Sequence, residues 1–242
     1  MKIKYMISAF FSAALLLSCT MSLNIFAADQ YQDKRDEVIM IVNEQRSAVG
    51  KTELYESELL NQAAQLRAEE IIGNFSHTRP DGRAGYTAFT DLGGQYMAVG
   101  ENIAYGYPTE ADVMDGWMNS EGHRANILND AYHAMGVGVA TKGNTLYWVQ
   151  IFSDGKNLTP LYTKGNINRD NLTDSTDAAA ILVDAAQKGA GISGCLNRMQ
   201  VSFADLNQNQ RADADDASII LRYAAYVGTG GTANIESFCG VA

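Results

Sequence analysis

The spacing of apolar residues predicts three helices in the first half of the chain. Residues 32–49 and 57–73 each repeat apolar side chains at the three- and four-residue spacing that places them on one face of a helix. Ser57 is a residue type that commonly caps helices, and we expect it to begin the second one. The third helix is expected to start after Pro108.

The pattern changes to that of strands further along. Residues 135–153 contain two runs rich in β-branched and aromatic residues around the turn sequence KGNT, which predicts a β-hairpin. Residues 31–155 therefore read as one α+β domain. Residues 156–164 contain Pro160 and several polar side chains, and we interpret them as a linker.

The remainder of the chain contains a repeat. Residues 166–187 and 205–227 each consist of a polar loop followed by an apolar helix, and the two loops start 39 residues apart. A unit that occurs twice is a stronger signal than either copy alone.

Both polar loops have the spacing of a twelve-residue calcium loop, which supplies oxygen atoms from positions 1, 3, 5, 7, 9 and 12. These positions are Asn166, Asn168, Asp170, Leu172, Asp174 and Asp177 in the first loop, and Asp205, Asn207, Asn209, Arg211, Asp213 and Asp216 in the second. Leu172 and Arg211 would contribute only their backbone carbonyls. Position 6, usually glycine, is Asn171 or Gln210 here. The alternative is a pair of Asx-turn loops that cap helices without a metal.

This duplicated loop–helix unit, residues 165–242, resembles a type I dockerin domain, whose loops end in aspartate. The resemblance implies a small all-α module with two Ca²⁺ ions. It also implies docking to a cohesin domain of a scaffold protein, as in cellulosomes. The family's partner-binding positions fall on Ser175, Thr176, Ala214 and Asp215.

The first domain contains all three histidines of the chain, and taken alone each is more often a structural residue than a ligand. The stretches FSHTRPDG, GENIAYG and WMNSEGHRANIL, however, resemble the CAP superfamily of cysteine-rich secretory, antigen 5 and pathogenesis-related proteins. That resemblance implies a three-layer α-β-α sandwich with a cleft lined by His77, Glu101 and His123. Ser120 stands where eukaryotic members have a second acidic residue, so Glu121 is the candidate for the fourth position. Such a set of side chains would suit Zn²⁺.

Three functions remain open for the first domain. The first is a non-catalytic ligand-binding module, which the dockerin-like module would anchor to a scaffold. The second is an extracellular hydrolase, such as a peptidase, that uses His77, Glu101, Glu121 and His123 with or without a metal. The third is a carbohydrate-active enzyme, for which Glu101 and Glu121 are the candidate carboxylates.

The N-terminal residues predict export. Residues 1–28 have a positive start, an apolar segment and a small-residue cleavage site near Ala27, which are typical of a signal peptide, and no other stretch is long and apolar enough to cross a bilayer. Lipid attachment at Cys19 is the alternative. We expect a secreted protein, associated with a complex or the cell surface, in which Cys195 and Cys239 form a disulfide. The formal charge of −10 argues against binding to nucleic acid.

Overall fold

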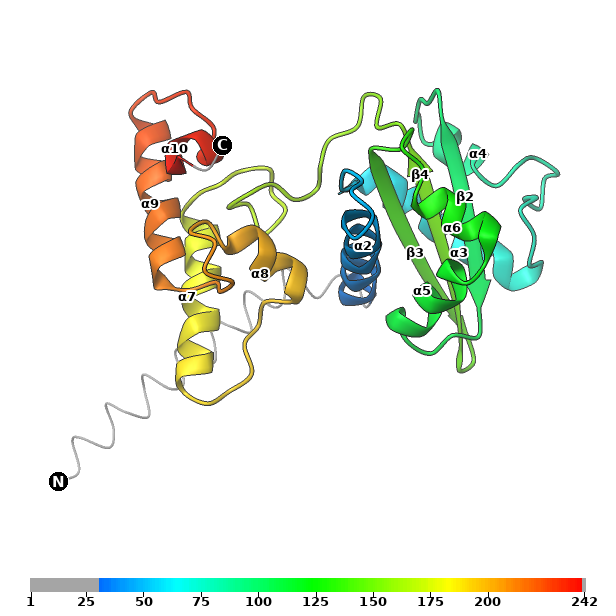
Figure 1. Ribbon diagram of the computed structural model, residues 1–242, viewed down its shortest axis with the longest axis horizontal. Coiled ribbons are helices and arrows are strands. Elements are labelled where there is room, and N and C mark those ends of the chain that lie inside the picture. The colour runs from blue at the N-terminus through cyan, green and yellow to red at the C-terminus, as the bar shows by residue number, and fades with distance from the viewer. Residues whose placement is uncertain (1–30, 241–242) are drawn as a thin grey trace. The chain divides into compact units, whose positions relative to one another are not determined.

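The computed structural model describes residues 31–240, which fall into two compact units, Tyr31–Leu161 and Tyr162 onward (Figure 1). The predicted signal peptide and Cys19 lie outside the described residues. Within residues 31–240, no helix is long and apolar enough to cross a membrane.

The first unit is built around a mixed four-stranded sheet of order β1-β3-β4-β2. The strands are β1 (Tyr55–Glu56), β2 (Val99–Tyr105), β3 (Ala134–Lys142) and β4 (Thr145–Ser153). Strand β1 is parallel to β3, and the other two pairings are antiparallel. The predicted hairpin is confirmed as β3 and β4, joined by a tight turn in which Gly143 has a positive φ of 61°.

Helices pack on both faces of this sheet. Helix α3 (Glu58–Gly73) lies against β3 and β4 and also contacts α4 (Thr87–Asp91). Helix α2 (Gln32–Ser47) packs on β3 and on α5 (Glu110–Met118), while α6 (Glu121–Ile127) packs on β2. The three predicted helices are thus present. Ser57 is the N-cap residue of α3 as expected, but its side chain makes no capping hydrogen bond.

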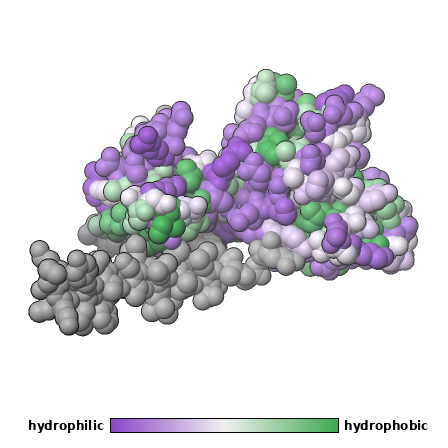
Figure 2. Space-filling view, turned by 90° about the horizontal axis from the view of Figure 1, so that it is seen from below, coloured by the Kyte–Doolittle hydropathy of each residue, from purple (hydrophilic) through white to green (hydrophobic). Residues whose placement is uncertain are grey.

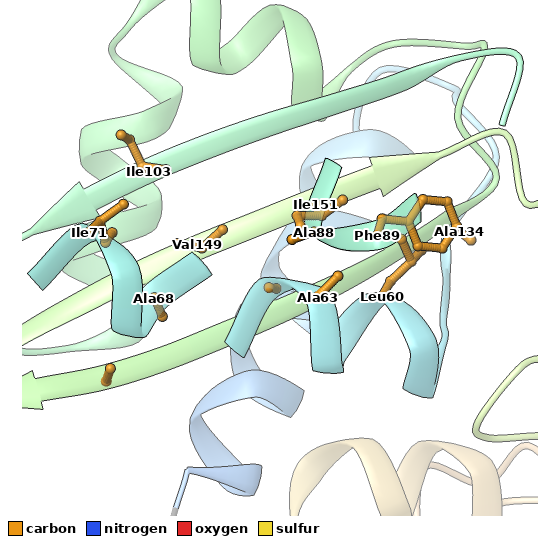
Figure 3. Packing of buried hydrophobic residues seen from close by; sticks show 12 residues of the cluster. Leu60, Ala63, Ala68, Ile71, Ala88, Phe89, Ile103, Ala134, Val149 and Ile151 are labelled. Atoms are coloured by element: carbon orange, nitrogen blue, oxygen red, sulfur yellow. The ribbon is translucent and has the colours of Figure 1, made fainter. Parts of the chain in front are cut away.

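The apolar side chains of the first unit lie mostly inside it. The surface seen in Figure 2 is largely hydrophilic, with hydrophobic residues in separate patches. Between α3 and the sheet, Leu60, Ala63, Ala68 and Ile71 meet Val149 and other strand residues (Figure 3). The regular three- and four-residue spacing of these helix residues gives α3 its buried face.

Two glycines of β3 let α3 approach the sheet closely. A side chain at Gly136 would lie 2.2 Å from the carbonyl carbon of Leu60, and one at Gly138 would lie 2.1 Å from the carbonyl oxygen of Ala64. Because both obstacles are backbone atoms, neither can move without shifting the whole helix.

Between residues 162 and 240, the second unit contains four helices. They are α7 (Ser175–Gly189), α8 (Arg198–Ala204), α9 (Ala214–Gly228) and α10 (Ile235–Cys239). The paired helices α7 and α9 pack against each other. Their shared core repeats at the 39-residue spacing, with Ile167 and Leu206, Ala178 and Ala217, and Ile181 and Ile220 as equivalent members.

This unit starts inside the stretch expected to be a linker. Tyr162 is buried because its ring stacks on Phe203, with centroids 5.2 Å apart, and because the guanidinium carbon of Arg169 lies 4.3 Å from its centroid. Arg169 also donates a hydrogen bond to the Tyr162 hydroxyl. Tyr162 is therefore part of the second unit.

The predicted bond between Cys195 and Cys239 is not present in this structure and stays a prediction. The two residues are anchored to different helices. The segment around Cys195 is held on α7, because the N–H of Leu196 donates to Asp184 at 2.9 Å. Cys239 belongs to α10, which packs against α9, and burial raises the pKa of its thiol.

We predict that Gly136→Ala lowers the free energy of unfolding of the first unit by about 1–3 kcal/mol, because the added methyl group meets backbone atoms of α3. Gly73→Ala is the matched control, since no atom lies within 4 Å of the added methyl group. Denaturant unfolding of both variants checks this. Equal stability of Gly136→Ala and the unmodified protein would contradict the proposed close approach.

Candidate functional site

The first candidate site lies at the outer strand of the sheet. Glu101 belongs to β2, which forms one edge of the sheet, and His77 lies in the segment between α3 and α4. His77 Nδ1 is 2.8 Å from Glu101 Oε1. Because a carboxylate only accepts hydrogen bonds, Nδ1 carries the proton of this pair and Nε2 is left as the second ring nitrogen. His77 is exposed, whereas the Glu101 side chain is almost completely buried.

His123 belongs to the same neighbourhood but comes from α6. Burial lowers the pKa of His123, and the charge of nearby His77 lowers that pKa further. The backbone carbonyl of His123 accepts a hydrogen bond from Asn102 Nδ2 at 3.1 Å. Asn102 is fully buried and is fixed in turn by Gln150 and Asn126, so α6 is held firmly against β2.

Glu121, the predicted fourth member, has no hydrogen bond or ion pair to His77, Glu101 or His123 within residues 31–240, and its role in the site stays a prediction. It is the first residue of α6, it is exposed, and it makes no side-chain hydrogen bond or ion pair with any residue of 31–240. A carboxylate in the first turn of a helix interacts favourably with the helix dipole, and that explains its position without a role in the site. His133 is also exposed and lies outside the cluster.

A residue that sequence reasoning missed, Arg67, completes the cluster. Its Nε donates to Glu101 Oε2 at 2.8 Å and its Nη1 donates to Glu70 at 2.6 Å. The Arg67 side chain is only 1% exposed. The signal was present in the sequence, because Arg67 follows Leu60, Ala63 and Ala64 at helical spacing and so falls on the buried face of α3.

The network continues from Arg67 toward the surface. Glu70 accepts hydrogen bonds from Arg79, which also forms an ion pair with Asp91 at 2.7 Å. Although burial raises the pKa of Glu70, the hydrogen bonds from Arg79 and Arg67 outweigh it, and the net pKa of this carboxyl lies below its usual range. Asp91 is paired with both Arg79 and Arg83, which hold the pKa of its carboxyl below its ordinary value.

Glu101 is not available as a direct zinc ligand in this cluster. Zinc bound by two histidines and a carboxylate needs an available carboxylate oxygen. Both oxygens of Glu101 already accept hydrogen bonds, from His77 Nδ1 and from Arg67, and its side chain is almost completely buried. The hydrogen bond to Nδ1 leaves Nε2 of His77 as the ring nitrogen that could bind a metal. Within residues 31–240, neither this cluster nor the two polar loops described below bring three or more His, Cys, Asp or Glu side chains together as a metal site.

The second candidate site consists of the two polar loops of the second unit. Asp177 Oδ1 accepts the backbone N–H groups of Ile167 and Asn168, at 2.8 and 3.2 Å, and its Oδ2 accepts that of Asp174 at 3.0 Å. Asp216 accepts the three equivalent N–H groups of the second loop, from Leu206, Asn207 and Asp213, at 2.9, 3.2 and 3.0 Å. The two loops therefore close in the same way.

The two loops also have the same backbone conformation at equivalent positions. Asn171 and Gln210, at position 6, have positive φ values of 65° and 67°. Arg169 and Gln208, at position 4, are left-handed too, with φ of 67° and 61°. This conformation costs a side chain other than glycine some energy, so its recurrence at equivalent positions indicates that the loop shape is required.

Other side-chain oxygens of the loops accept backbone hydrogen bonds and so form Asx-type turns. Asn168 and Asp170 accept N–H groups two residues further on, as Asn207 and Asn209 do in the second loop. Asp174 and Asp213 are the N-cap residues of α7 and α9, and each forms a capping box with the aspartate three residues later. The structure therefore contains the helix caps that the alternative interpretation, Asx-turn loops without a metal, predicts. Carbonyl and carboxylate oxygens keep further lone pairs, so the oxygen-only donor set also fits a hard cation.

The predicted partner-binding residues occupy the first turns of the paired helices. Ser175, Thr176, Ala214 and Asp215 are all exposed. Thr176 also takes part in the cap, because its hydroxyl donates to Asp174 at 2.7 Å.

Comparison with known proteins identifies the first unit. The family model described as "Cysteine-rich secretory protein family" (CAP) matches residues 40–152. These residues therefore form a CAP domain, as the sequence motifs predicted. The curated protein YkwD of Bacillus subtilis is 34% identical over 118 residues, which are 48% of this chain and 45% of YkwD. The B. subtilis membrane protein YlbC is 46% identical over 57 residues, 24% of this chain and 15% of YlbC. The chain thus spans less than half the length of either relative.

Solved structures show similar proteins. An extracellular protein of Bacillus anthracis that contains an SCP domain is 27% identical, with a TM-score of 0.46 over 50% of this chain and 40% of the other. An outer surface protein of Borrelia burgdorferi is 19% identical, with a TM-score of 0.48 over 52% of this chain and 95% of the other.

We predict that His77→Gln raises the pKa of His123 part of the way back to its ordinary value near 6.5, because it removes the charge of His77 but leaves the burial of His123 unchanged. His133→Gln, which removes an exposed histidine outside the cluster, should leave that pKa unchanged. NMR titration of the imidazole protons checks both variants.

The sign of the pH effect on stability follows from the same shift. Since the pKa of His123 is lowered in the folded state, the unfolded chain binds the proton more readily, and His123 lowers stability as the pH falls below about 6.5. His123→Asn should weaken this dependence between about pH 7 and 5. An unchanged pH dependence of thermal unfolding would contradict the burial of His123.

Proposed function

We propose that this protein is exported and that its second unit is a dockerin-like module that binds two Ca²⁺ ions and docks to a cohesin domain of a scaffold protein. In this proposal the CAP domain is a ligand-binding module carried on the resulting extracellular, cellulosome-like complex. Export is inferred from residues 1–28 of the sequence.

The observation that carries the calcium proposal is the environment of Asp177 and Asp216. Both side chains are fully buried, and neither forms an ion pair with a Lys or Arg of residues 31–240. Burial raises the pKa of both carboxyls. A buried carboxylate without a nearby cation is costly, and a Ca²⁺ ion at the last position of each loop would offset that cost.

Each loop would hold its ion with the predicted residues. The first site would use Asn166, Asn168, Asp170, Asp174, Asp177 and the carbonyl of Leu172. The second would use Asp205, Asn207, Asn209, Asp213, Asp216 and the carbonyl of Arg211. A bound ion would order the loops and thereby fix α7 and α9 for docking.

Exposed apolar residues on the paired helices support docking to a protein partner. Leu182 on α7 and Leu221 on α9 occupy equivalent positions, 39 residues apart, and are 44% and 45% exposed. They follow the exposed first turns that contain Ser175 and Thr176, and Ala214 and Asp215. Exposed apolar side chains of this kind commonly mark interaction surfaces.

Exposed aromatic rings near the His77–Glu101 pair support a binding role for the CAP domain. Phe75 and Tyr105 are 45% and 53% exposed, and their rings make an edge contact with centroids 4.7 Å apart. Tyr105 also stacks on Tyr147, at 5.7 Å. Tyr105 lies on the same face of β2 as Glu101, four residues further on.

One observation favours the second candidate function, a hydrolase. Glu101 fixes the orientation of His77 through Nδ1, an arrangement that also serves histidines acting as general bases. Incubation of the full chain with a peptide library, with His77→Ala as the control, separates the two functions. Cleavage that disappears in the variant would favour a peptidase, and absence of cleavage in both would favour the binding module.

We predict that calcium raises the thermal unfolding temperature of the second unit and that Asp177→Ala combined with Asp216→Ala abolishes both this effect and cohesin binding. The first unit should unfold as before, because neither residue belongs to it. Glu236→Ala, which removes an exposed carboxylate of the same unit, is the matched control.

Calorimetry with calcium and with a purified cohesin measures both effects. If the double variant keeps full cohesin affinity in the presence of a calcium chelator, the proposal is wrong. If calcium has no effect on the unmodified protein, the two loops act only as helix caps.

A further inference from the structure

His77 is anchored to buried residues although its own ring is exposed. Its Nδ1 lies 2.8 Å from Glu101 Oε1, while 60% of its side chain is exposed. Its backbone carbonyl accepts the N–H of Gly85 at 2.7 Å, and the carbonyl of the preceding residue, Ser76, accepts a hydrogen bond from Arg67 Nη2 at 2.7 Å. Both the backbone and one ring nitrogen of His77 are therefore fixed from below.

Arg67 links these contacts to one another. Its Nε donates to Glu101 Oε2 at 2.8 Å, so one guanidinium holds the carboxylate that His77 contacts and also the backbone next to His77. Arg67 is itself fixed, because its Nη1 donates to Glu70 at 2.6 Å and its side chain is only 1% exposed. Gly85 packs directly on Glu101, since a side chain at Gly85 would lie 2.3 Å from Oε2. Arg67 and Gly85 together determine where the carboxylate lies.

The direction of the hydrogen bonds follows from the chemistry of Arg67. A guanidinium has N–H donors and no acceptor, so the oxygen of Glu101 that faces it must accept. Beside this permanent charge the carboxylate is ionised and accepts at its other oxygen as well, which places a proton on His77 Nδ1. In the neutral ring the lone pair is then on Nε2, which makes no hydrogen bond with any residue of 31–240.

We infer that Arg67 is a positioning residue that sets the hydrogen-bonding polarity of His77. Acting through Glu101, it leaves an unprotonated Nε2 at the surface, which suits ligands that donate a hydrogen bond, such as a hydroxyl or an amide N–H group. Both functions considered for the CAP domain use this state, since a binding module needs an acceptor at His77 and a hydrolase needs a base. The inference rests on the proposal that His77 contacts the ligand of the CAP domain.

The experiment determines the tautomer of each histidine from the ¹⁵N shifts of its two ring nitrogens, by NMR on the full chain with ¹⁵N-labelled histidine. The buffer contains calcium but no transition metal and is held at about pH 8.5, where neutral imidazole predominates. Signals lost in His77→Gln and in His133→Gln assign the rings. The unmodified protein is compared with Glu101→Gln, alone and combined with Arg67→Lys, Arg67→Met or Arg83→Met. Circular dichroism establishes which variants are folded.

We expect the tautomer of His77 to reverse in Glu101→Gln. The unmodified protein should have the proton on Nδ1. A glutamine at position 101 has one acceptor oxygen and one donor nitrogen. Because Arg67 can only donate, the amide oxygen must face Arg67 and the amide nitrogen must face His77, so that Nδ1 accepts and the ring proton moves to Nε2. The ratio of the two tautomers should change by about tenfold or more, the effect of one hydrogen bond.

The double variants test whether Arg67 causes this reversal. Arg67→Lys keeps a side chain that only donates, and the reversed tautomer should persist. Arg67→Met removes the donor, so the amide of Glu101→Gln can turn either way and both tautomers of His77 should be populated. Arg83→Met is the matched control, because Arg83 is exposed and pairs with Asp91 instead of Glu101. It should leave the reversed tautomer unchanged.

A proton on Nε2 of His77 in the unmodified protein would overturn the inference. An unchanged tautomer in Glu101→Gln would overturn it too, as would a reversal that persists in a folded combination with Arg67→Met. If that combination does not fold, the unmodified protein, Glu101→Gln and the Arg67→Lys combination still decide. None of these measurements involves a ligand, so failure of the proposed ligand-binding function is distinguishable from failure of this inference.

Discussion

The close approach of α3 to β3 is the constraint on which the first unit depends. Gly136 and Gly138 leave no side chain between the strand and the backbone of the helix. This fixes the height and the rotation of α3 over the sheet, and with them the side chain of Arg67, which extends from the buried face of α3 to Glu101 on β2. The candidate site is therefore a consequence of backbone packing several residues away from it.

Glu101 and the last aspartates of the two loops are buried carboxylates that are compensated in different ways. Glu101 has Arg67 as a built-in positive partner, so its charge is compensated within the fold. Asp177 and Asp216 receive only backbone N–H groups, three each, and have no Lys or Arg partner within residues 31–240. This contrast is why we propose a cation in the loops of the second unit.

Much of the architecture follows from local sequence patterns. Helices α2 and α3, the β-hairpin and the two loop–helix units could all be predicted, because each forms from side chains close together in sequence. Strand β2 carries Glu101 but has no distinctive alternation and was not predicted as a strand; only its GENIAYG motif drew attention to this stretch. Helical spacing places Arg67 on the buried face of α3, but its contact with Glu101 could not be predicted, since it depends on which side chains meet across elements. The sequence suggested Glu121 for the site, and the structure adds Arg67 to the cluster.

We propose that this chain holds calcium in its second unit. The most direct measurement is the calcium content of the full-length protein after equilibration with calcium and removal of unbound metal. We predict two calcium ions for each chain. A complete absence of bound calcium would contradict this proposal.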